Sequence, residues 1–131
     1  MKVVLDTNVL LAALATHGLC ESVLDVCLDS HELILSEHIL AEVERNLRAK
    51  FKIPPQDARQ FIQFLRQEAN MVEPVAVPQD SCDDKDDLPV LGTAMAGSAD
   101  CIVSGDKHLL KLINFKGIPI HSPRAFYDQL R

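Results

Sequence analysis

The stretch VVLDTNVLL, residues 3–11, decides the fold of this chain. Three apolar residues typical of a strand lead into Asp6, Thr7 and Asn8, after which apolar periodicity resumes. This order predicts a short buried strand, a polar turn and a helix. In a sheet of parallel strands, Asp6 would lie at the carboxyl end of its strand, where ligands bind. The alternative is that Asp6 only caps the helix, with Thr7 and Asn8 as local hydrogen-bonding groups.

Length and composition predict one soluble domain that spans residues 1–131. The 47% hydrophobic and 24% charged content is ordinary for a globular protein. The net charge of −6 argues against a general nucleic-acid coat, and the low aromatic content argues against base stacking as the main binding mode. The charges are segregated, since residues 45–66 hold six basic residues and one acidic residue, whereas residues 80–87 hold five Asp and one Lys.

Cysteine spacing and hydropathy indicate the cellular compartment in which the protein is expected. None of the four cysteines belongs to a Cys-x-x-Cys pair, which favours free thiols in a reducing cytoplasm over disulfides or a zinc site. The apolar N-terminal run is interrupted by Asp6 and Asn8, so we interpret it as part of the fold and not as a secretory signal. No apolar span reaches the length of a membrane helix, and we expect a cytoplasmic protein without a membrane partner.

The remaining chain alternates between helical and strand patterns. Further strands are predicted at residues 33–35, 101–103 and 118–120, and residues 72–77 are at best an edge strand because Pro74 interrupts them. Ser36 is a predicted N-cap, and Pro89 and Pro123 suit the first turns of helices. Helices are predicted at residues 20–29, 37–51, 58–69, 89–97, 107–112 and 123–130. This alternation predicts a parallel sheet with helices on both faces.

Acidic residues recur where this fold places ligand sites. The sequences VVLD, ending at Asp6, and IVSGD, ending at Asp106, each carry an Asp past a predicted strand. Asp87 at a helix start and Glu42 early in a helix can reach the same sheet edge. Carboxylates that meet in one crevice must protonate or share a cation, and hard oxygen ligands favour Mg²⁺ or Mn²⁺. Such a site suits hydrolysis of a phosphodiester, although any single Asp can be a structural cap.

Four segments together make the chain resemble the PIN domain, a fold of metal-dependent ribonucleases. They are LDTNVL at residues 5–10, LSEHILAE at 35–42, DLPVL at 87–91 and ADCIVSGD at 99–106. The resemblance covers essentially the whole chain. It is strongest to the prokaryotic subgroup described as toxin components of toxin–antitoxin pairs. It implies a three-layer α/β/α fold with a short, mainly parallel central sheet.

The resemblance also implies roles for individual residues. The catalytic and metal-holding positions match Asp6, Glu42, Asp87 and Asp106. Small polar positions near the site match Thr7, Asn8 and Ser36. The acidic run leaves the register of the third carboxylate open among Asp83, Asp84, Asp86 and Asp87. We choose Asp87 because Pro89 and Leu91 follow at the expected places, keep Asp84 and Asp86 as additional ligands, and take Glu44 as the alternative to Glu42.

The leading hypothesis is a Mg²⁺- or Mn²⁺-dependent endoribonuclease that hydrolyses single-stranded RNA and leaves a 5′-phosphate. The alternatives are a catalytically quiet module that binds RNA or protein, and a phosphatase acting on small phosphates. The resemblance makes a cognate antitoxin and a homodimer plausible partners. The basic residues are either a solvated helical face or an RNA contact, namely Arg45, Arg48, Lys50 and Lys52. Asp100 is expected to serve a turn or strand start, and no catalytic His is proposed among His38, His108 and His121.

Overall fold

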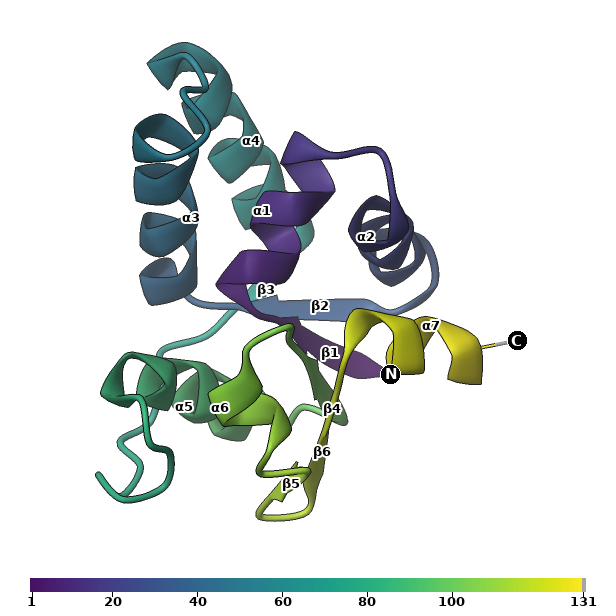
Figure 1. The fold of residues 1–131 in the computed structure, drawn as a ribbon, viewed down its shortest axis with the longest axis vertical. Coiled ribbons are helices and arrows are strands. Elements are labelled where there is room, and N and C mark those ends of the chain that lie inside the picture. Colours follow the sequence, from purple (N-terminus) through teal and green to yellow (C-terminus); the bar gives the residue numbers. More distant parts are fainter. Residues whose placement is uncertain (131) are drawn as a thin grey trace.

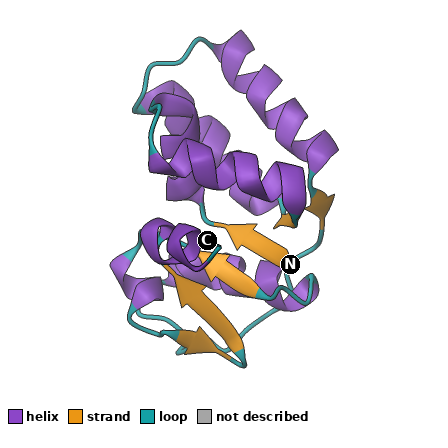
Figure 2. Cartoon of the chain, turned by 90° about the vertical axis from the view of Figure 1, so that its right-hand side faces the viewer, coloured by secondary structure: helices purple, strands orange, loops and turns teal. Residues whose placement is uncertain are grey.

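A computed structural model describes residues 1–130 and shows a mixed sheet of six strands between helices (Figures 1 and 2). The strands are β1 (Lys2–Leu5), β2 (Glu32–Leu35), β3 (Asn70–Met71), β4 (Cys101–Val103), β5 (Asn114–Phe115) and β6 (Ile118–His121). Their order is β3-β2-β1-β4-β6-β5, and every neighbouring pair is parallel except β5 with β6. The predicted mainly parallel sheet, flanked by helices, is therefore confirmed.

Helices cover both faces of the sheet. They are α1 (Thr7–Ala15), α2 (Leu19–Ser30), α3 (Glu37–Ala49), α4 (Pro55–Glu68), α5 (Leu88–Ala96), α6 (Lys107–Leu110) and α7 (Pro123–Gln129), with a short 3-10 helix, η1 (Lys85–Asp87), before α5. Figure 1 shows α1 to α4 gathered on one side of the sheet and α5 and α6 on the other. The α7 helix packs against α2 and β6.

The core forms around β1, which lies between β2 and β4. Leu5, Ile34 and Ile102, one from each of these three strands, are fully buried. Burying an apolar side chain of this size stabilises the fold by about 1.5–3 kcal/mol before opposing terms are counted. Strands buried on both faces are expected to be continuously apolar, as these are.

Two parts of the chain differ from the predictions. The edge strand is Asn70–Met71 and not residues 72–77, where one bond from the Val72 amide to the Leu35 carbonyl (2.9 Å) extends the pairing before Pro74. Strand β5 was not predicted; it is only two residues long and pairs with β6 across a tight turn in which Gly117 has φ +88°. Periodicity cannot identify an element this short.

The structure describes the state of the cysteines and the length of the apolar helices. All four cysteines are free thiols, and Cys82 is buried although it lies in the acidic loop. Within residues 1–130, no single helix is long and apolar enough to cross a membrane. The pair α1 and α2 reaches that length and composition together, but the two helices are bent by 107° at their break.

Candidate metal centre

The strand register brings Asp6 next to Ser104. Leu5 of β1 pairs with Val103 of β4, and the Asp6 amide donates to the Val103 carbonyl at 3.0 Å. From β1 the chain adds β2 and β3 on one side of the sheet, and from β4 it adds β6 and β5 on the other side. The carboxyl ends of β1 and β4 are therefore the switch point of the sheet, where α/β proteins bind ligands. Asp6 is only 4% exposed there, so its carboxylate lies at the bottom of the site.

Ser104 is a site residue that the sequence analysis missed. It is fully buried, and its hydroxyl donates to Asp6 Oδ2 at 2.7 Å while accepting from the Asp106 amide at 2.9 Å. One hydroxyl therefore orients the carboxylate of Asp6 and the backbone of Asp106. The sequence signal that could have identified Ser104 is its position. It is a small polar residue directly after β4, and β4 is the neighbour of the strand that Asp6 follows.

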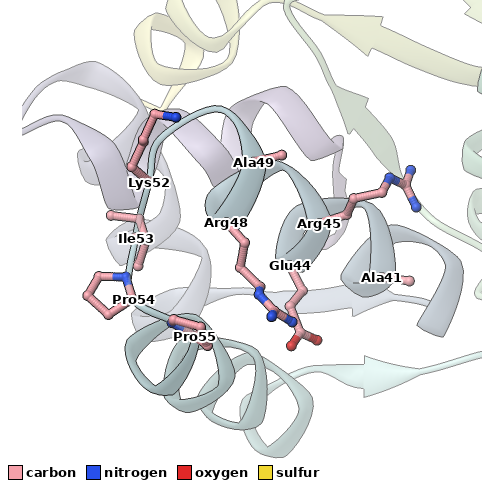
Figure 3. Close-up of a pocket in the computed structure, with 9 residues that line it drawn as sticks. All are labelled: Ala41, Glu44, Arg45, Arg48, Ala49, Lys52, Ile53, Pro54 and Pro55. Atoms are coloured by element: carbon pink, nitrogen blue, oxygen red, sulfur yellow. The ribbon is translucent and has the colours of Figure 1, made fainter.

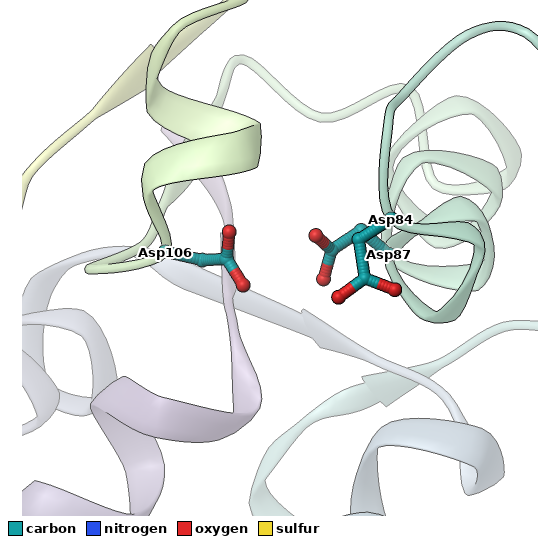
Figure 4. A group of neighbouring side chains, drawn as sticks. All are labelled: Asp84, Asp87 and Asp106. Carbon is teal, nitrogen blue, oxygen red and sulfur yellow. The ribbon is translucent and has the colours of Figure 1, made fainter.

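Three further carboxylates converge near Asp6. Ligand oxygens of Asp84, Asp87 and Asp106 all lie within 4.8 Å of one another, and Figure 4 shows Asp106 pointing toward the other two. Asp87 occupies the N-cap position of α5, yet its side chain makes no capping hydrogen bond. Asp84 accepts from the Asp86 amide at 3.0 Å, and Asp106 accepts from the His108 amide at 2.7 Å. Each of these bonds runs to an amide two residues further along the chain, and so it fixes the orientation of the Asp84 or Asp106 carboxylate locally.

Glu42 approaches the site from the second turn of α3. Its Oε1 accepts a hydrogen bond from the Thr7 hydroxyl at 3.3 Å, which links the start of α1 to α3. His38 Nε2 lies 3.3 Å from the same oxygen, and Arg45 lies 3.9 Å from Oε2. The Glu42 side chain is 22% exposed, so it lines the mouth of the site and not its base.

The pKa values of Asp87 and Asp6 are raised by burial and by the neighbouring carboxylates. Burial first, and then the charges of Asp106, Asp6, Asp84 and Glu42 in decreasing order, together raise the pKa of Asp87 to about 7. Burial also raises the pKa of Asp6, although the hydrogen bonds from Ser104 and from the Thr7 amide oppose this shift. Nearby anions thus disfavour full ionisation of the cluster in the protein alone.

The cluster has the donor set of a hard cation site. Within residues 1–130, no Lys, Arg or His side chain forms an ion pair with Asp6, Asp84, Asp87 or Asp106. Buried carboxylates without a cationic partner are costly unless they protonate or share a cation. Carboxylate oxygens are the ligands that Mg²⁺ and Mn²⁺ prefer, so the residues present fit such an ion.

Other candidate residues have structural contacts instead. Asn8 Oδ1 accepts from the Gly105 amide at 3.1 Å and so holds the turn between Ser104 and Asp106. Ser36 caps α3, accepting from the Ile39 amide at 3.5 Å and from the Thr93 hydroxyl at 2.9 Å, and ties α3 to α5.

The remaining acidic candidates lie outside the three-carboxylate group. Asp83 forms an ion pair with Lys111, and Asp86 is exposed. As expected of a strand-start residue, Asp100 accepts from the Lys2 amide at 2.7 Å. Glu44 lines a groove between α3 and α4 instead of the metal centre.

Three of the four basic residues at positions 45–52 line one groove, and Lys50 does not. The groove between α3 and the chain leading into α4, about 730 Å³, is lined by Glu44, Arg45, Arg48 and Lys52, but not by Lys50. Figure 3 shows Arg48 and Glu44 extending together toward α4, whereas Arg45 extends from another side of α3. Of the four basic residues, Arg45 is the one that pairs with a carboxylate of the candidate centre.

Solved structures of two other proteins have a similar fold. A chain in the structure of VapBC2 from Rickettsia felis, bound to a DNA fragment from their promoter, has a TM-score of 0.63 at 13% identity, covering 93% of this chain and 98% of that one. VapBC-1 from nontypeable Haemophilus influenzae has a TM-score of 0.63 at 14% identity, covering 95% and 99%. A search of curated protein sequences found no match. The family model of the PIN domain matches residues 2–108, and the chain therefore belongs to the PIN domain family.

Proposed function

We propose that this protein is a divalent-metal-dependent endoribonuclease that hydrolyses phosphodiester bonds of single-stranded RNA. The observation that carries this proposal is the convergence of Asp84, Asp87 and Asp106 within 4.8 Å, beside Asp6, with no cationic side chain paired to them among residues 1–130. Membership of the PIN domain family supports nuclease chemistry at this position. The preference for RNA follows from the sequence resemblance.

The ion-holding residues are Asp6, Asp84, Asp87 and Asp106, and Glu42 completes the negative site from the mouth. A bound Mg²⁺ or Mn²⁺ supplies charge stabilisation for phosphate oxygens and lowers the pKa of water. Ser104 keeps Asp6 in one orientation, which reduces the cost of assembling the site. Thr7 similarly limits the movement of Glu42.

Arg45 is the proposed contact for the RNA backbone. Its side chain is 66% exposed and lies 3.9 Å from Glu42, so a phosphate group that enters beside Glu42 meets a guanidinium there. Arginine binds phosphate through several parallel donors, and phosphate contacts dominate nucleic-acid affinity. A protein with a net charge of −6 needs such a local positive group to hold a polyanion near its carboxylates.

The experiment is cleavage of a labelled RNA oligonucleotide by the wild-type protein and by Asp6→Asn, with Mn²⁺ or with EDTA. We expect cleavage by the wild type with metal and none in EDTA or with Asp6→Asn. Asp25→Asn, an exposed Asp on α2, is the matched control and should cut normally. Equal rates for the wild type and Asp6→Asn would reject the proposal.

Two further measurements separate the alternatives. Hydrolysis of a nucleotide monoester in place of RNA would indicate a phosphatase. RNA binding without cleavage, and without carboxylate-dependent binding of Mn²⁺, would indicate a quiet module.

We also propose an antitoxin as a protein partner. The two structures of similar fold are from VapBC, which supports a toxin of that kind. Co-purification with the product of an adjacent short reading frame, and loss of RNA cleavage in the complex, would test this. A homodimer stays a prediction of the sequence resemblance.

A further inference from the structure

A second hollow lies beside the metal centre. It has a volume of about 470 Å³ and lies between the start of α3, residues 73–77 and the start of α5. Its walls are mostly apolar, and its polar members are Glu37, His38 and Glu73. Pockets of this size hold small ligands or single groups of larger ones.

The walls of this hollow are held together by specific contacts. The Val75 amide donates to the Gly92 carbonyl at 3.2 Å, which fastens residues 73–77 to α5. Gly92 permits this approach, because a Cβ there would lie 2.3 Å from the Val75 carbonyl oxygen. The bond between Thr93 and Ser36, 2.9 Å long, fastens α5 to α3. The hollow is thus bounded on all three sides by connected elements.

Two residues that line the hollow are neighbours of residues in the candidate metal centre. Leu88 lines it and directly follows Asp87 in the chain. His38 lines it too, and its Nε2 lies 3.3 Å from Glu42 Oε1. A nucleotide whose phosphate lies at the carboxylates would therefore have its base at the opening of this hollow.

We propose that this hollow binds the base adjacent to the scissile phosphate and that Glu73 makes guanine the preferred base. This inference rests on the proposed nuclease function. The apolar walls, among them Pro74, Val77 and Pro89, suit the faces of a base, and the partly exposed imidazole of His38 offers a stacking surface.

Base choice follows from the hydrogen-bonding groups of the hollow. The Glu37 carboxylate is occupied by Arg66, with bonds of 2.9 and 2.8 Å. Within residues 1–130, the Glu73 carboxylate makes no hydrogen bond or ion pair, so it remains available. An ionised carboxylate only accepts hydrogen bonds. Guanine presents two adjacent donors, N1–H and the N2 amino group, which match the two carboxylate oxygens, whereas uracil presents one N–H.

The first test compares cleavage of RNA oligonucleotides that differ only in the base adjacent to the scissile phosphate. This base is guanine, hypoxanthine (as inosine), adenine or uracil. We expect kcat/KM to favour guanine over uracil by about tenfold, within the range of a good bidentate contact. Loss of the N2 amino group in inosine should remove part of this preference. Glu73→Gln should reduce the preference to about twofold or less. Glu68→Gln, an exposed Glu at the end of α4, is the matched control and should keep it.

A second variant and a binding measurement keep the inference separate from the nuclease proposal. Ala76→Phe fills the hollow from an exposed position, and we expect it to remove the base preference while the protein stays folded. In metal-free protein, guanosine should shift the backbone NMR signals of residues 73–77 and 88–89 more than uridine does. Wild-type cleavage that ignores the base, or a preference that survives Glu73→Gln, would overturn the inference alone. Guanosine-dependent shifts without any RNA cleavage would instead reject the nuclease function and leave the base site standing.

Discussion

The Ser104 hydroxyl donates a 2.7 Å hydrogen bond to Asp6 across 98 residues of sequence, and this bond joins the carboxyl ends of β1 and β4. The same hydroxyl accepts from the Asp106 amide. Two candidate ligands, one following each strand, thus depend on a single buried group. Such supporting contacts determine how well a metal site is organised before the ion binds.

Replacing Ser104 with Ala should therefore weaken the site without removing a carboxylate. We expect the free energy of unfolding to fall by about 1–2 kcal/mol, since buried polar atoms lose their partner. Binding of Mn²⁺ should weaken by about tenfold or more, as is usual for groups that orient a metal ligand. Denaturant unfolding and Mn²⁺ calorimetry measure the two effects. Ser22→Ala on α2 serves as control, and unaltered Mn²⁺ affinity in Ser104→Ala would contradict this role for the hydroxyl.

The raised pKa of Asp87 predicts how stability depends on pH in metal-free buffer. Its pKa is about 7 in the folded protein and 3.8 in the unfolded reference, so the folded state binds the proton more tightly. The contribution of Asp87 to the free energy of unfolding should be fully present below about pH 4 and should be lost as pH rises through about 7. Melting temperatures measured in EDTA between pH 5 and 8 should show this decline.

Two comparisons assign that pH dependence to the cluster. Asp87→Asn should flatten the decline, whereas Asp86→Asn, which changes an exposed neighbour, should not. Excess Mn²⁺ should raise the melting temperature most at high pH, because the ion then binds an ionised cluster. A decline that is equally steep in Asp87→Asn would show that other groups cause it.

Arg45→Ala should reduce RNA affinity more than turnover. We expect KM for RNA to rise about three- to tenfold with kcat within about twofold, because the lost contact is to a phosphate and not to the reacting atoms. The salt dependence of binding should also become shallower. Arg59→Ala, an exposed Arg on α4, removes the same charge elsewhere. If both variants behave alike, Arg45 has no special place on the RNA path.

Gly92→Ala tests how closely residues 73–77 pack on α5. The added Cβ would lie 2.3 Å from the Val75 carbonyl oxygen, so the two segments must separate. We expect a loss of about 1–3 kcal/mol in the free energy of unfolding, as for other overpacked positions. At Gly18, a Cβ would meet only Thr16 Oγ1 at 4.0 Å, so Gly18→Ala is the control. Urea unfolding that does not distinguish the two variants would contradict the packing argument.

The sequence by itself determined the local elements and the fold class. Apolar runs identified the buried strands β1, β2, β4 and β6. The predicted N-cap role of Ser36 and the predicted helix start at Pro123 are also present. These features depend on neighbours within a few residues, which is why pattern and propensity suffice for them. The alternation of strands and helices then permits few sheet arrangements.

Only the tertiary structure decided which groups meet. The register of β1 against β4 makes Ser104 the partner of Asp6, and the path of the acidic loop brings Asp84 and Asp87 to Asp106 while Asp83 turns to Lys111. The same packing forms the hollow between the start of α3, residues 73–77 and the start of α5. These contacts join residues far apart in the chain, and their geometry follows from sheet pairing and core packing, which no local pattern contains.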